Sequence, residues 1–134
     1  MSGPRYDLPT VEAETAPWWE AAARGELLIR RCGACAKAHL YPRPFCPSCW
    51  SEDVSWEQAV GTGTLYTWSE VRSNDLPPFK ERVPYIAAIV DLTEGPRLET
   101  NIVGVTEGEL SIGMALKVDF SDVGDVHIPV FRPA

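Results

Sequence analysis

The spacing of apolar and polar positions changes near Val60. Beyond that residue, short stretches rich in β-branched and aromatic residues alternate with glycine, proline and acidic residues. We predict strands in five of these stretches: 61–72, 85–92, 97–105, 115–120 and 126–131. Short strands separated by turn residues in this way predict a mostly β domain that closes as a small Greek-key barrel.

Two glycines and two connections shape the predicted barrel. Gly61 and Gly63 allow the first strand to be long, bulged and bent. A polar, proline-rich loop covers 73–84, and loops of this length in compact domains tend to be functional. We expect a turn or a short helix at 108–113, between the third and fourth strands.

One short segment before the barrel has helical spacing. Thr15 and Pro17 are a typical cap and first-turn proline, and we expect the helix over 18–24. Trp18 and Trp19 share one face with two alanines, and so short a helix must pack against another surface to be stable. That surface is either the chain's own core or a partner protein, since tryptophan is enriched at interface hot spots.

The remaining N-terminal segments have less regular patterns. Residues 26–31 predict a short strand that leads into the first cysteine pair. We interpret 51–59 as a connector, in which Trp56 covers the join to the barrel. The predicted organisation is an extended arm over 1–14, a helix and a cysteine-containing module over 15–58, and the barrel over 59–134.

The four cysteines of the chain form two C-x-x-C pairs. Ten residues separate Cys32 and Cys35 from Cys46 and Cys49, which leaves room for one short hairpin. The turn within each pair lets both thiolates reach one ion, and two such turns complete the tetrahedral all-sulfur shell of a structural zinc site. We therefore predict a zinc ribbon whose ion has no open coordination position, so that it stabilises the fold and does not activate water.

These cysteines could also form disulfides, act as a redox pair or bind iron. Disulfides need an oxidising compartment, and nothing at the N-terminus directs export. A redox C-x-x-C normally opens a helix in a βαβ unit, which the pattern lacks. Rubredoxin-type iron uses the same ligands, so the sequence leaves iron open. His39 is a further possible ligand, but the four cysteines already fill the shell, and we predict that this histidine lies on the ribbon surface.

The formal net charge of −7 is unevenly distributed. The first fifty residues carry +1, so the rest of the chain carries −8. An acidic barrel disfavours binding to single-stranded nucleic acid, which draws its free energy from phosphate neutralisation, although Tyr66, Trp68 and Tyr85 lie on plausible strands. No export signal and no apolar run of membrane-spanning length occur, so we expect a cytoplasmic protein.

Several short motifs follow one another in a specific order. They are Arg-Gly-Glu-Leu-Leu at 24–28, the four cysteines, Gly-Thr-Gly-Thr-Leu-Tyr-Thr-Trp at 61–68, Pro-Tyr-Ile-Ala-Ala-Ile-Val-Asp-Leu at 84–92, Gly-Pro-Arg-Leu at 95–98, Ile-Gly-Met at 112–114 and Ile-Pro-Val-Phe-Arg-Pro at 128–133. Over residues 15–134 the chain thereby resembles the family, long named only as a domain of unknown function, that joins a rubredoxin-like zinc ribbon to a C-terminal OB-fold. The resemblance implies a mostly β fold, with an N-terminal helix and the ribbon followed by a five-stranded OB-fold barrel.

The same resemblance implies a function in acyl-CoA metabolism within a hetero-oligomer. The expected role is that of a non-catalytic accessory subunit of a thiolase-like enzyme, a retro-aldolase or thiolase acting on steroid or other bulky acyl-CoA side chains. One alternative is a partner subunit of a hot-dog-fold enoyl-CoA hydratase, and another is a single-stranded nucleic-acid-binding protein. Catalytic groups are scarce, with two histidines and no spare cysteine, so we predict no catalytic residue in this chain.

Coenzyme A carries phosphates and an adenine, so basic clusters and apolar surfaces are its candidate contacts. The basic candidates lie in the ribbon and around the loop at 73–84: Arg30, Arg31, Lys37, Arg43, Arg72, Lys80 and Arg82. Apolar side chains could also dock on the enzyme and complete a channel for the acyl group. The candidates for this partner interface are Trp18, Trp19, Leu76, Phe79, Tyr85 and Phe131.

Overall fold

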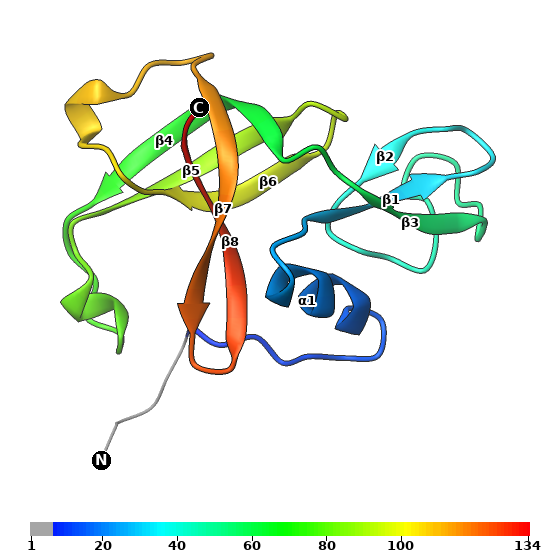
Figure 1. The fold of residues 1–134 in the computed structure, drawn as a ribbon, viewed down its shortest axis with the longest axis horizontal. Helices are drawn as coiled ribbons and strands as arrows, with labels where there is room; N and C mark the ends of the chain where they lie inside the picture. The colour runs from blue at the N-terminus through cyan, green and yellow to red at the C-terminus, as the bar shows by residue number, and fades with distance from the viewer. Residues whose placement is uncertain (1–6) are drawn as a thin grey trace.

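The N-terminal part of the molecule contains one helix and a small antiparallel sheet. The computed structural model describes residues 7–134, so the first six residues of the predicted arm lie outside the described residues. Helix α1 spans Ala16–Ala23, and strands β1 (Leu28–Cys32), β2 (Ala38–His39) and β3 (Val54–Gln58) form a sheet in the order β2-β1-β3 (Figure 1).

The C-terminal part is a closed five-stranded barrel. Its strands are β4 (Thr62–Val71), β5 (Tyr85–Leu92), β6 (Arg97–Ile102), β7 (Ala115–Val123) and β8 (Val126–Pro133). They pair in the order β4-β5-β6-β8-β7, and β7 closes the barrel on β4. Only the β6–β8 pair is parallel. The mostly β fold predicted from the sequence, a ribbon followed by an OB-fold barrel, is confirmed.

The irregular features of the barrel lie near the places where the sequence predicted them. β4 changes register between Leu65 and Thr67, which marks the expected bulge. An added Cβ at Gly63 would come within 2.5 Å of the Asp91 carbonyl oxygen, so this close crossing of β4 and β5 requires glycine. The loop at 73–84 contains a short 3₁₀ helix, η1 (Phe79–Glu81), and the expected short helix before β7 is η2 (Glu107–Glu109).

The prediction of a connector over 51–59 is wrong, because these residues contain strand β3. Each residue of β3 pairs with β1, from Val54 opposite Cys32 to Gln58 opposite Leu28. Trp56 lies on this strand opposite Arg30, whose guanidinium stacks over the indole ring at 4.2 Å, and it also packs against the core shared with the barrel. The polar residues of β3 did not predict a strand, because these residues are held in a strand by their pairing with β1.

The start of helix α1 also differs from the expectation. Pro17 occupies the first turn as predicted, but Thr15 makes no side-chain capping bond to the helix. Its hydroxyl instead donates to the Glu12 carbonyl oxygen at 3.3 Å, within a turn that precedes the helix. No helix of the described residues has the length and apolar character needed to cross a membrane.

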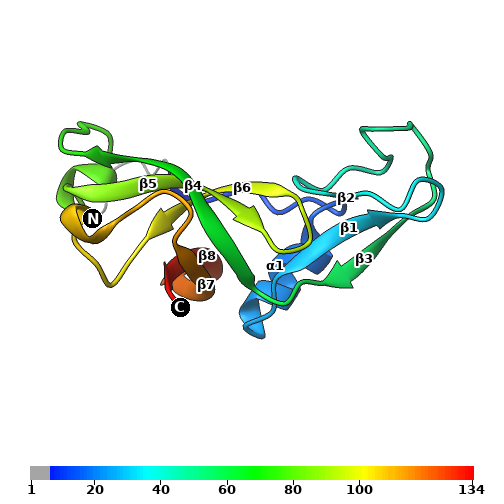
Figure 2. The same cartoon turned by 90° about the horizontal axis from the view of Figure 1, so that it is seen from above.

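A single apolar core joins the helix, the ribbon and the barrel. Trp18 is only 9% exposed, and its indole N–H donates to the Leu28 carbonyl oxygen at 3.1 Å. It belongs to the same buried cluster as Ile29 of the ribbon and Leu98 and Phe131 of the barrel. Figures 1 and 2 show α1 against the region where the ribbon meets the barrel.

A polar contact supplements this core at the same junction. The N–H of Glu99, on β6, donates to the hydroxyl oxygen of Tyr41, in the ribbon, at 2.9 Å. β6 pairs with β8 at a single position, Ile102 opposite Phe131, so Glu99 is not paired with β8. Tyr41 thus satisfies a backbone donor of the barrel from a loop 58 positions earlier in the chain.

The burial of Trp18 leads to a prediction about stability. We expect Trp18→Ala to lower the free energy of unfolding by about 3–5 kcal/mol, because it removes a large buried side chain and leaves a cavity. Denaturant-induced unfolding measures the change.

The matched control is Trp50→Ala, since Trp50 is 73% exposed. Its expected loss is below about 1 kcal/mol. Equal losses for the two variants would contradict the assignment of Trp18 to the shared core.

Candidate metal centre and binding surfaces

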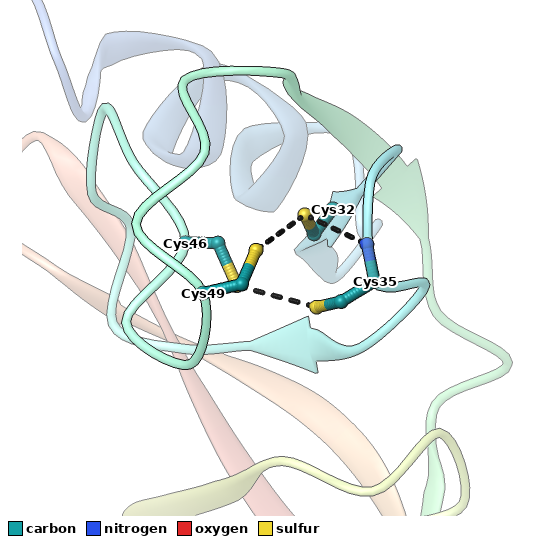
Figure 3. A group of neighbouring side chains, drawn as sticks. All are labelled: Cys32, Cys35, Cys46 and Cys49. Carbon is teal, nitrogen blue, oxygen red and sulfur yellow. Dashed lines mark hydrogen bonds between the residues drawn. The ribbon is translucent and has the colours of Figure 1, made fainter.

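The four cysteines converge from two turns of the ribbon. Cys32 ends β1 and begins the first turn with Cys35, whereas Cys46 and Cys49 form the second turn in the segment between β2 and β3. Their four sulfur atoms all lie within 4.8 Å of one another (Figure 3). Cys32 and Cys46 are buried and Cys49 is exposed, so the cluster lies at the edge of the ribbon.

Backbone amides already point at two of these sulfur atoms. The N–H groups of Ala34 and Cys35 donate to Cys32 Sγ at 3.3 and 3.4 Å, and the N–H of Ser48 donates to Cys46 Sγ at 3.4 Å. Such bonds favour the thiolate form. The backbone N–H of Cys35 lowers the pKa of Cys32, and the N–H groups of Cys49 and Ser48 lower the pKa of Cys46 to about 6. Both cysteines are therefore prepared to act as anionic ligands.

The distances between sulfur atoms fit a tetrahedral metal site. Cys32 Sγ lies 3.6 Å from Cys49 Sγ, and Cys35 Sγ lies 3.6 Å from Cys46 Sγ. A metal–sulfur bond of about 2.3 Å places the corners of a tetrahedron about 3.8 Å apart. A disulfide needs sulfur atoms about 2 Å apart, so the cysteines are free thiols. The four side chains are thus positioned to bind one metal ion.

The prediction for His39 is wrong, because this histidine lies inside the ribbon. Its side chain is 7% exposed and neither ring nitrogen has a hydrogen-bond partner among the described residues. Burial lowers its pKa, and the positive charges of Arg30 and Arg43 lower it further. His39 is opposite Arg30 on the neighbouring strand, so strand pairing turns the ring inward as a neutral core residue.

Two arginines of the ribbon, Arg30 and Arg31, are engaged within the chain. Arg30 contacts Glu14 at 3.2 Å in addition to the Trp56 ring. Arg31 binds both carboxylate oxygens of Glu57, at 3.3 and 2.8 Å, and this hydrogen-bonded pair raises the pKa of Arg31 and lowers that of Glu57. These two candidate contacts for coenzyme A are therefore already paired.

The other basic candidates are partly free. Arg72 pairs with Glu70 and Arg82 pairs with Asp7. Lys37, Arg43 and Lys80 are exposed and have no ion pair among residues 7–134. The ribbon and the loop at 73–84 lie at opposite ends of the molecule, so the structure does not bring the two basic groups together (Figure 1).

The aromatic residues considered for base stacking are engaged in other contacts. Arg97 covers the ring of Tyr66 at 3.6 Å, the indole N–H of Trp68 donates to Glu107, and the hydroxyl of Tyr85 accepts a bond from Asn74. Arg97 is itself bound to Asp91 at 2.7 Å. Trp68 also lines a hollow of about 420 Å³ over β4, β5 and β6, and among the described residues its lining includes Glu99 but no lysine or arginine.

The candidate interface residues fall into three environments. Phe131 is completely buried in the barrel core and is not available to a partner. Leu76 is half exposed, and Phe79 and Tyr85 line a hollow of about 210 Å³ beside the loop at 73–84. Trp18 and Trp19 line a larger apolar hollow of about 330 Å³ between α1, the ribbon and the barrel.

Two exposed aromatic residues were not identified from the sequence. Trp50 follows the last cysteine and its ring stacks on Phe45, with centroids 5.2 Å apart. Tyr41 is 52% exposed and also lines the larger hollow. Trp50 could have been suspected from its place beside a metal ligand, whereas no local pattern reveals that Tyr41 reaches the barrel.

Two family models match consecutive parts of the chain. Residues 19–55 match the family described as "ChsH2, rubredoxin-like zinc ribbon domain", and residues 56–121 match the one described as "ChsH2, C-terminal OB-fold domain". A solved structure titled "Ltp2-ChsH2(DUF35) aldolase" contains a similar chain, with a TM-score of 0.83 and 38% identity. The similarity covers 94% of this chain and 98% of that one.

Two curated relatives have similar sequences. One is a "Probable enoyl-CoA hydratase alpha subunit" of Thermomonospora curvata, 39% identical over 94% of this chain. The other is a "DUF35 domain-containing scaffold protein" of Pyrococcus furiosus, 37% identical over 64% of this chain. The chain spans 39% of the length of the first relative and 64% of the length of the second.

The geometry of the cysteine cluster predicts how the protein responds to metal removal. We expect one bound metal ion per chain, and we expect Cys46→Ser to lose it and to unfold the ribbon, because metal binding contributes about 10–16 kcal/mol in zinc-finger peptides. Elemental analysis of the purified protein identifies the ion, and circular dichroism with added chelator measures the unfolding. Acid should release the ion, since protons compete for the thiolates.

The control variant is Ser48→Ala. Ser48 lies in the same turn and donates its backbone N–H to Cys46 Sγ, but its side chain is not a metal ligand. It should retain the ion. Full metal content in Cys46→Ser, or a chelated protein that keeps its ribbon, would contradict the assignment.

Proposed function

Since this chain belongs to the ChsH2 (DUF35) family, in which a rubredoxin-like zinc ribbon precedes an OB-fold, we propose that it is the non-catalytic accessory subunit of a thiolase-like acyl-CoA enzyme. The observation that carries this proposal is the similarity to a chain of the Ltp2-ChsH2(DUF35) aldolase over nearly the full length of both. The partner is then a protein of the Ltp2 type, bound in a hetero-oligomer.

The groups available in this chain favour a non-catalytic role. His39 is buried without a hydrogen-bond partner, and His127 is paired with Asp122 at 2.5 Å on the exposed β7–β8 hairpin. All four cysteines belong to the metal cluster. Neither histidine and none of the four cysteines is therefore left in the arrangement of nucleophile and base that covalent catalysis requires. The acid and the base of the reaction are assigned to the partner.

The proposed reaction is carbon–carbon cleavage of a β-hydroxyacyl-CoA with a bulky side chain, such as one derived from a steroid. In a retro-aldol step, a base removes the hydroxyl proton, the bond between the α and β carbons breaks, and the α carbon is protonated to leave a shorter acyl-CoA and a carbonyl product. The accessory chain would support the walls of that active site. The cations proposed to contact phosphates of coenzyme A are either Lys37 and Arg43 in the ribbon or Lys80 at the opposite end of the molecule, all without an ion pair among residues 7–134.

The metal ion is proposed to be zinc with a structural role. Four cysteine ligands fill the coordination shell, so the ion would hold the two turns together and take no part in the reaction. We also propose a cytoplasmic location, where cysteines remain reduced and available to the metal.

A second candidate function is that of a subunit of an enoyl-CoA hydratase. The observation that favours it is the name of the Thermomonospora curvata relative, which is a hydratase alpha subunit. This chain spans 39% of that relative, so it would correspond to one part of such a subunit.

Co-expression with an Ltp2-type protein tests the first proposal. We expect a stable complex by size-exclusion chromatography that cleaves a β-hydroxyacyl-CoA, whereas this chain alone has no activity. Assays with an enoyl-CoA substrate separate the aldolase from the hydratase function.

A second complex, made with Trp50→Ala, tests whether this exposed ribbon aromatic contributes to assembly. Turnover by the isolated chain, or an Ltp2-type protein that is fully active and elutes separately, would contradict the accessory role.

A further inference from the structure

The face between α1 and β8 carries a continuous apolar groove. The hollow of about 330 Å³ is lined by Trp18, Trp19, Ile128 and Pro129 together with Tyr41 and Leu98. A second hollow of about 250 Å³ is lined by Val11, Ala23 and Val126, and Trp19 lines this one as well. The two hollows therefore meet at Trp19 and follow the helix along β8.

Carboxylates surround this groove without counter-charges. Glu99 lies at the first hollow, and Glu20 and Asp125 lie at the second. All three are exposed and none has an ion pair among residues 7–134. Among residues 7–134 no lysine or arginine lines either hollow, and the one ionisable side-chain nitrogen there, on His127, is paired with Asp122.

We propose that this groove is the docking site for a basic amphipathic segment of the partner protein, whose apolar side chains fill the hollows and whose lysines and arginines face Glu20, Glu99 and Asp125. Charge complementarity identifies this occupant. An acidic or neutral segment would leave three exposed carboxylates unpaired or repelled, whereas a basic one pairs with them as the apolar groups are buried. The assignment of this segment to an Ltp2-type protein rests on the proposed function.

The volumes and the rigidity of the site agree with this occupant. Hollows of about 330 and 250 Å³ suit large side chains that anchor an interface, which are typically aromatic and enter well-formed pockets. The walls come from elements that share one core, because Trp18 is buried and Tyr41 is bonded to β6. A site formed in advance requires little ordering when the segment binds.

The test is a charge reversal of the groove in the full chain. The variant Glu20→Lys/Glu99→Lys/Asp125→Lys changes only exposed side chains that make no hydrogen bond within the described part of the chain. Its fold is checked by metal content and circular dichroism. The control Glu52→Lys/Asp75→Lys/Glu81→Lys changes the net charge equally at exposed positions outside both hollows. Binding to an Ltp2-type protein is measured by titration calorimetry.

We expect the groove variant to bind the Ltp2-type protein at least about tenfold more weakly than wild type and the control variant to bind within about twofold, because repulsion acts only where the charges meet. Equal weakening of both variants, or of neither, would overturn the groove proposal and leave the accessory function in place.

A second probe decides the matter if no complex with an Ltp2-type protein forms. It is a labelled synthetic amphipathic peptide of leucine, phenylalanine and lysine, compared with a version in which glutamate replaces lysine and one in which serine replaces the apolar residues. We expect wild type to bind only the first peptide and the groove variant to prefer the glutamate version. Failure of wild type to prefer the lysine peptide would overturn the groove proposal, whereas the expected exchange of preference would support it even though the proposed partner had failed.

Discussion

The apolar core shared by α1, the ribbon and the barrel is the constraint on which the rest of the structure depends. Trp18, Ile29 and Leu98 come from three different parts of the chain and are buried in one cluster. Neither the eight-residue helix nor a three-stranded sheet of this size has enough apolar surface to be stable alone. Their packing on the barrel fixes the ribbon in place, and surfaces from all three parts then form a single face.

The metal cluster complements that core at the far side of the ribbon. The two cysteine turns, one between β1 and β2 and the other between β2 and β3, have little regular structure, and backbone amides there donate to cysteine sulfur instead of to a neighbouring strand. An ion that joins both turns replaces the apolar contacts that so short a segment cannot make. The ribbon is thus held by a core at one end and by four thiolates at the other.

The same construction agrees with the proposed accessory role. His39 and the four cysteines are used for structure, as the burial of the one and the convergence of the others show. Most arginines in the described part of the chain are neutralised by carboxylates, as Arg31 is by Glu57. Apolar hollows with acidic borders remain open between α1 and β8, and they are the proposed docking site.

The sequence by itself determined the metal ligands, the barrel strands and the family resemblance, because these depend on local spacing. The two C-x-x-C turns and the alternation along β5 act over a few residues and can be seen without knowledge of the fold. Only the tertiary structure decided that Trp18 and Phe131 are core residues, that His39 is buried and that 54–58 is a strand. Burial and strand pairing depend on partners distant in the chain, and the Tyr41–Glu99 bond across 58 positions has no local signal that a sequence could display.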